Sequence, residues 1–134
     1  VEGVEYVDLD MLLRESDIVS LHVPQTPATI GMIGQRELSL MKPTAVLINT
    51  ARGPVVDSKA LAAALHSGEI AGAGVDVFET EPPIAEDHPL FSAPNVVATP
   101  HVAFATAESM VKRAGIVMEN IGCYLNGTPR NVIC

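Results

Sequence analysis

The stretch Thr44-Ala45-Val46-Leu47-Ile48-Asn49-Thr50-Ala51-Arg52-Gly53 decides the fold of this 134-residue chain. Its first half, Thr44 to Ile48, is a short apolar run that is rich in β-branched residues and follows Lys42-Pro43. This pattern is typical of a strand that is buried on both faces of a parallel sheet. We expect Asn49 and the residues after it to leave the strand.

Arg52 then stands at the carboxyl end of this strand, in an Arg52-Gly53-Pro54 turn before a helix that begins near Asp57. Open α/β sheets bind their ligands at that end of their strands. The planar, permanently charged guanidinium suits a carboxylate or a polarised carbonyl oxygen. The alternative is an ordinary surface arginine in a strand-to-helix loop.

The rest of the chain alternates strand-like runs with helical ones. Further strands are predicted at Asp17–Val23, Ala71–Val77 and Asn95–Ala98, and helical segments after the N-cap Asp8, over Gly34–Met41, from Asp57 to His66 and over Thr106–Leu125. The segment Glu79–Pro94 is expected to be irregular, and Val132-Ile133 to form a last short strand. Alternating strands and helices imply right-handed crossovers, so we predict an α/β fold in which the main strands are parallel neighbours.

Composition excludes some classes of function. The formal net charge of −8 argues against a nucleic-acid surface, and no apolar stretch approaches the length of a membrane span. Cys123 and Cys134 fit no zinc-binding spacing, so we interpret them as ordinary thiols in a cytoplasmic protein. The residues from Val1 onward read as the end of one unit entering a helix, which predicts that the chain is a fragment.

Three ionisable residues lie just beyond the ends of predicted strands: Arg52, Glu81 and His101. Asp76, at the end of its own strand, adds a second carboxylate at the same edge. In a parallel sheet those ends share one edge, so residues far apart in sequence can converge there. An imidazole can give or take a proton near neutral pH, and a carboxylate beside it would orient the ring. An arginine nearby would hold an anionic substrate, and Asp76 could accept a hydrogen bond from a cofactor amide.

Simpler interpretations stand beside these. For Glu81 the alternative is a solvated loop carboxylate, since Glu79, Glu86 and Asp87 lie close by in sequence. His22 is interpreted as a loop residue and His66 as a residue of the last turn of a helix. His88 is interpreted as a solvated residue of a proline-rich loop. Histidines scattered in this way predict no metal site.

Several motifs in order resemble the D-isomer-specific 2-hydroxyacid dehydrogenase family. They are Ile48-Asn49-Thr50-Ala51-Arg52-Gly53, Val56-Asp57 with Ala60-Leu61, Gly74-Val75-Asp76-Val77-Phe78-Glu79-Thr80-Glu81-Pro82, and Asn95-Val96-Val97-Ala98-Thr99-Pro100-His101. The resemblance implies hydride transfer between a nicotinamide cofactor and C2 of a small 2-oxo or 2-hydroxy acid. It implies a doubly wound, Rossmann-like domain of which residues 1–105 are the C-terminal part, with residues 106–134 forming a long helix and tail that return toward a substrate domain.

The resemblance also implies roles for particular residues. Arg52 matches the arginine that binds and polarises the substrate, and His101 matches the general acid that protonates the forming alkoxide. Glu81, directly before Pro82, matches the carboxylate that pairs with this histidine. Cofactor contacts are implied at Val23, Thr50, Ala51, Arg52, Asp76 and His101, with NAD as the cofactor and NADP not excluded.

The chain departs from the family pattern at two places. Phe104 after the histidine resembles the D-lactate and D-hydroxyisocaproate dehydrogenase branch more than the phosphoglycerate branch. No GxGxxG fingerprint is present, and we expect it to precede Val1, so the chain alone is expected to be inactive. The whole protein is expected to be a homodimer. Alternatives from other classes are a corepressor-like, NAD-sensing regulator and a purely structural or dimerising piece.

Overall fold

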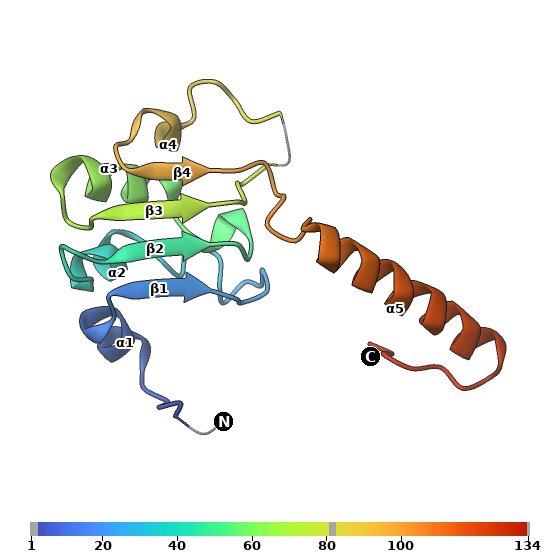
Figure 1. Ribbon diagram of the computed structural model, residues 1–134. Coiled ribbons are helices and arrows are strands. Elements are labelled where there is room, and N and C mark those ends of the chain that lie inside the picture. The colour runs from blue at the N-terminus through green and yellow to red at the C-terminus, as the bar shows by residue number, and fades with distance from the viewer. Residues whose placement is uncertain (1–2, 81–82, 134) are drawn as a thin grey trace. The chain divides into compact units, whose positions relative to one another are not determined.

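A computed structural model describes residues 3–80 and 83–133 of the chain (Figure 1). The chain divides into two compact units, Val1–His101 and Val102–Cys134, which are described separately below. The first unit contains a parallel sheet and the short helices that cover it. The second unit contains one long helix and the tail that follows it.

The sheet of the first unit has four parallel strands in the order β1-β2-β3-β4. These strands are β1 (Ile18–Leu21), β2 (Val46–Asn49), β3 (Gly72–Val75) and β4 (Val96–Ala98), and their arrows point the same way in Figure 1. The predicted set of neighbouring parallel strands is therefore confirmed. Each strand begins one or two residues later than predicted, and β1 and β3 also end earlier. The prediction that Asn49 leaves the strand was wrong, because Asn49 is the last residue of β2 and pairs with Leu21 and Val75.

The helices of the first unit are α1 (Leu9–Glu15), α2 (Gln35–Leu40), the 3₁₀ helix η1 (Gly53–Val55), α3 (Ser58–Ser67) and α4 (Pro89–Ser92). Three of them, α1, α2 and α3, lie where the sequence signals placed them, whereas η1 and α4 were not predicted. Asp8 caps α1 by accepting from the Met11 N–H, and Asp57 caps α3 by accepting from the N–H groups of Lys59 and Ala60. Gly68 ends α3 in the left-handed conformation, with φ of 73°.

The core lies between one face of the sheet and the helices. Leu47 of β2 is fully buried, whereas Val46 and Ile48, which point to the other face, are only partly buried. Ile18 of β1 is 64% exposed on that second face. The prediction that the organising strand is buried on both faces was therefore wrong, because the helices α2 and α3 lie on one side of the sheet in Figure 1.

The second unit contains α5 (Ala107–Leu125), which Thr106 caps by accepting from the Ser109 N–H. None of the helix residues is buried, and Asn126 and Gly127 end it as predicted. The predicted strand at Val132-Ile133 is absent from this described part of the tail. Within residues 3–80 and 83–133, no helix is long and apolar enough to cross a membrane.

Candidate functional site

The carboxyl edge of the sheet carries most of the residues singled out from the sequence. Arg52 follows β2, Asp76 follows β3, and His101 lies shortly after β4. Val23 follows β1 at the same edge. Because the strands are parallel, their carboxyl ends reach this edge together, as Figure 1 shows.

The turn after β2 is held by the side chain of Asn49, which is 1% exposed. Its Oδ1 accepts a hydrogen bond of 3.1 Å from the Ala51 N–H, and its Nδ2 donates one of 3.1 Å to the Arg52 carbonyl oxygen. The Arg52 guanidinium is exposed, and its Nη1 donates to the Ala51 carbonyl oxygen at 2.7 Å. The backbone of this turn is therefore fixed, while the charged group lies at the surface.

A shallow hollow of about 340 Å³ opens beside this turn. It is lined by Val23, Thr50, Ala51 and Arg52, together with His22 and Pro24. The structure thus brings together four of the residues for which a cofactor contact was implied. His22 had been interpreted as a loop residue, and its Nε2 lies 2.9 Å from the Ser20 hydroxyl.

Asp76 and His101 are joined at the ends of β3 and β4. The His101 N–H donates to the Asp76 carbonyl oxygen at 2.8 Å, and the Asp76 N–H donates to the Asn49 carbonyl oxygen at 3.0 Å. The Asp76 side chain is 4% exposed, and its Oδ1 accepts from the Thr99 hydroxyl at 2.5 Å. His101 has φ of 57°, in the left-handed region.

Gly53 brings the turn after β2 against the segment that follows β3. A Cβ atom at Gly53 would lie 1.9 Å from both the carbonyl carbon and the carbonyl oxygen of Phe78. Only glycine permits this close approach of two backbones. The contact sets the start of the segment that leads to Glu81, which itself lies outside the described residues.

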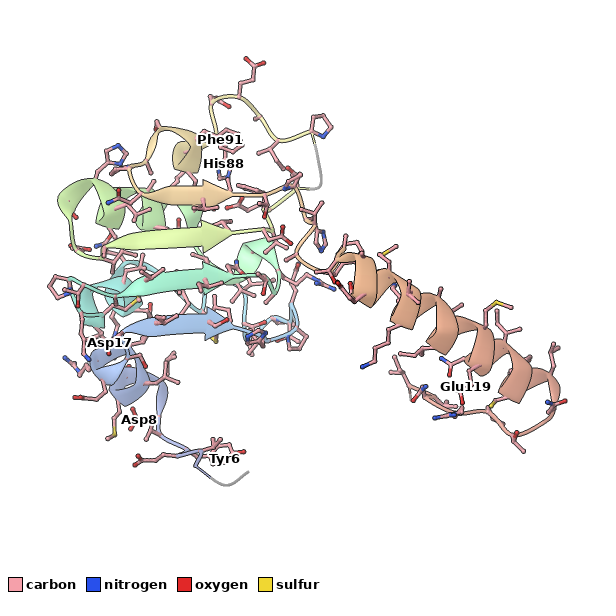
Figure 2. All side chains as sticks on the ribbon, viewed as in Figure 1. Tyr6, Asp8, Asp17, His88, Phe91 and Glu119 are labelled. Carbon is pink, nitrogen blue, oxygen red and sulfur yellow. The ribbon has the colours of Figure 1, made fainter. Side chains whose placement is uncertain are left out.

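The loop after Phe78 is more ordered than predicted. It contains α4 and a largely enclosed histidine, since the His88 side chain is 12% exposed. Its Nε2 lies 3.1 Å from Glu79 Oε2, and its ring meets Phe78 edge-on with centroids 5.1 Å apart. Figure 2 shows His88 beside Phe91, whose ring centroid is 5.5 Å away. The interpretation of His88 as a solvated residue was therefore wrong.

The electrostatics of Glu79 follow from this pairing. Partial burial alone would raise the pKa of the Glu79 carboxyl, but hydrogen bonds from Ser58 and His88 outweigh that effect. The net result is a pKa below the ordinary carboxyl value. The carboxylate is therefore charged at neutral pH and can pair with the His88 ring.

Three functional features of this edge were missed in the sequence. Asn49 closes the arginine turn, Thr99 bonds the buried Asp76, and His88 bonds Glu79 across the loop. The role of Asn49 could have been found from the sequence, because an asparagine that ends an apolar run often bonds nearby backbone through its amide. Across the described ranges, no cluster of histidine, cysteine, aspartate or glutamate could hold a metal ion.

Comparisons with known proteins agree with this architecture. Residues 1–103 match the model of the D-isomer specific 2-hydroxyacid dehydrogenase NAD-binding domain. A glyoxylate reductase of Thermococcus litoralis is 52% identical over 132 residues, which are 98% of this chain and 39% of that protein. These matches show that the chain belongs to the D-isomer-specific 2-hydroxyacid dehydrogenase family.

Solved structures give the same result. An acyclic imino acid reductase in complex with NADPH and D-Arg is 41% identical with a TM-score of 0.90, covering 100% of this chain and 42% of that one. A D-lactate dehydrogenase from Aquifex aeolicus, complexed with NAD and lactic acid, is 39% identical with a TM-score of 0.78, covering 92% and 41%. The chain spans about two fifths of the length of the relatives it matches.

Proposed function

We propose that this chain is the C-terminal part of the cofactor lobe of a longer enzyme that reduces small 2-oxo acids with a nicotinamide cofactor. The observation that carries the proposal is the shared carboxyl edge, where the Arg52 turn is linked through Asn49 and Asp76 to His101. Residues 1–105 would belong to that lobe and residues 106–134 would return toward a substrate lobe. The whole enzyme would act as a homodimer in the cytoplasm.

The residues at this edge fit a nicotinamide cofactor. The hollow beside Val23, Thr50 and Ala51 offers backbone groups at the end of parallel strands, and Asp76 is a buried acceptor close by in the sheet. A carboxylate held in this way suits the N–H groups of a carboxamide. The cofactor would supply the hydride, and both NAD and NADP remain compatible with these residues.

The chain's own side chains would bind the substrate and move a proton. The Arg52 guanidinium would bind the carboxylate and the oxo oxygen of the substrate as a planar fork, orienting C2 and stabilising the charge that develops on the oxygen. His101 would donate a proton to that oxygen as the alkoxide forms. Glu81 would keep the imidazole oriented.

The substrate is proposed to be a small 2-oxo acid, either glyoxylate or the oxo acid that corresponds to lactate. The 52% identity to a glyoxylate reductase favours the first, and Phe104 after the histidine favours the second. Comparing kcat/KM for the two acids in the full-length enzyme would decide between them. Equal values would show that neither feature sets specificity.

Steady-state kinetics of the full-length enzyme test the proposal. We expect Arg52→Lys to lower kcat/KM for the oxo acid strongly, because a point charge does not reproduce the planar fork. A control at the exposed Arg14 of α1, Arg14→Lys, should leave kinetics unchanged. Wild-type kinetics in a folded Arg52→Lys enzyme would contradict the assignment and favour the regulatory, corepressor-like alternative.

A further inference from the structure

Asn49 occupies an unusual position for a polar side chain. It is the last residue of β2, a central strand of the sheet, and is 1% exposed among buried apolar residues. Its strand neighbours in register are Leu21 of β1 and Val75 of β3. A buried amide is tolerated in such a place only when its polar atoms are hydrogen-bonded.

Both ends of this amide bond the turn that carries the arginine. Oδ1 accepts from the Ala51 N–H and Nδ2 donates to the Arg52 carbonyl oxygen, each at 3.1 Å. The side chain therefore binds both an N–H group and a carbonyl oxygen of the same turn. An amide suits this position because it presents an acceptor and a donor on one short planar group.

The backbone of Asn49 continues the connection toward the other side of the site. Its carbonyl oxygen accepts from the Asp76 N–H at 3.0 Å, and the Asp76 carbonyl oxygen accepts from the His101 N–H at 2.8 Å. A continuous series of hydrogen bonds thus runs from the Arg52 backbone through Asn49 and Asp76 to the His101 backbone. Asn49 takes part in this series with both its side chain and its backbone.

We propose that Asn49 is a positioning residue, which sets the place of Arg52 relative to Asp76 and His101 in the hydride-transfer reaction. This inference rests on the proposed function, because it needs Arg52 to bind the substrate. It assigns no contact between Asn49 and the substrate. Asn49 acts through the backbone of the turn, so its loss would displace the Arg52 fork from the anion that it binds. Small displacements of a binding group can lower turnover by about 100-fold.

A matched pair of substitutions separates positioning from stability. Asn95 directly precedes β4 and is exposed, and its Nδ2 donates to the Ala71 carbonyl oxygen at 3.0 Å. Asn49→Asp and Asn95→Asp make the same chemical change, because each carboxylate replaces an N–H donor with an acceptor that faces a carbonyl oxygen. Only Asn49 lies at the carboxyl edge. Both variants are made in the full-length enzyme, with thermal melts recorded beside kinetics.

We expect Asn49→Asp to lower kcat/KM for the oxo acid by roughly 10- to 100-fold, because a displaced Arg52 fork binds the carboxylate and stabilises the developing charge less well. Asn95→Asp should lower the melting temperature without changing kcat/KM per folded molecule. If both variants lose stability and neither changes kcat/KM per folded molecule, Asn49 is structural only and the inference is overturned. Should Asn49→Asp fail to fold, Asn49→Ser keeps a hydroxyl acceptor for the Ala51 N–H and carries the same test with a smaller effect.

A double-mutant cycle with Arg52→Ala identifies the route of the effect. If Asn49 acts through Arg52, Asn49→Asp should cause little further loss in an enzyme that already lacks the guanidinium. Fully additive losses would overturn the inference while leaving the proposed function intact. An Arg52→Ala enzyme with wild-type kinetics would instead overturn the proposed function itself, so the two failures are distinguishable.

Discussion

The His101 N–H donates a 2.8 Å hydrogen bond to the Asp76 carbonyl oxygen, which ties the proposed proton donor directly to the end of β3. The Thr99 N–H bonds the Val75 carbonyl oxygen at 2.9 Å, so the β3–β4 ladder continues up to this point. The backbone of His101 is therefore held by the end of the sheet.

Removing the imidazole should abolish proton donation. We expect His101→Ala in the full-length enzyme to lower kcat for oxo-acid reduction by about 10²–10⁴-fold. Glu81→Gln should also lower kcat, by less than His101→Ala, because the family resemblance implies that Glu81 orients this imidazole. Near-wild-type turnover in a folded His101→Ala enzyme would refute the mechanism, and a wild-type kcat in Glu81→Gln would refute the pairing.

Thr99→Val should destabilise the fold through Asp76. The substitution keeps the shape of the side chain but removes the hydroxyl that donates to the buried carboxylate. A hydrogen bond to a charged group contributes about 1.5–3 kcal/mol, and we expect a loss of that size in the free energy of unfolding. Thr128→Val, at an exposed 3.5 Å bond to Cys123, is the control, with an expected change within about 0.5 kcal/mol. Equal losses in urea titrations would count against this reading.

Gly53→Ala should be among the most damaging small substitutions. The added methyl would overlap the Phe78 backbone, so the turn and the loop must separate. We expect a loss of at least about 3 kcal/mol in unfolding free energy, or failure to fold. Gly74→Ala in β3 is the control, because its nearest atom would be Ile48 Cγ1 at an ordinary 3.9 Å. A Gly53→Ala chain as stable as the control would show that the backbones move apart freely.

The Glu79–His88 pair should make stability depend on pH in the acid range. Because the pKa of Glu79 is lowered in the folded chain, its carboxylate stabilises the fold above the ordinary carboxyl pKa. That contribution is lost as the pH falls through the lowered folded value. Urea midpoints of the wild type and Glu79→Gln should therefore differ at pH 7 and converge in acid. Glu86→Gln, in the same loop, should show no such convergence, and parallel curves for Glu79→Gln would exclude this linkage.

The chain alone should bind a dinucleotide weakly. The sequence holds no glycine-rich phosphate-binding fingerprint, and the proposed contacts are confined to the nicotinamide side. Titration calorimetry with NADH should give no micromolar affinity. A micromolar dissociation constant for these 134 residues would show that the hollow beside Arg52 suffices for binding.

The order and direction of the strands could be predicted from the sequence, because short apolar runs alternated with capped helices. Asp8, Asp57 and Gly68 marked helix ends through local bonds, which depend only on neighbouring residues. The boundary at Asn49 could not be placed in this way. Its amide is polar, yet it stays in the strand because the turn after it supplies a donor and an acceptor.

The contacts within the loop after Phe78 could not be predicted from the sequence either. Its prolines indicated irregular structure, but the edge-on contact of His88 with Phe78 and its bond to Glu79 join residues nine or more positions apart. Such contacts depend on how the chain folds back, which composition does not encode. The roles of Arg52, Glu81 and His101 came from family resemblance, and they stay predictions until variants are measured.

The left-handed backbone at His101 places a requirement of stability and a requirement of catalysis in conflict at one position. For most residues other than glycine this conformation costs roughly 1–2 kcal/mol, although histidine adopts it more readily than most. A search for thermostable variants would therefore favour glycine at position 101, since it relieves that strain. Such a variant would gain stability but would lose the imidazole that is proposed to donate the proton.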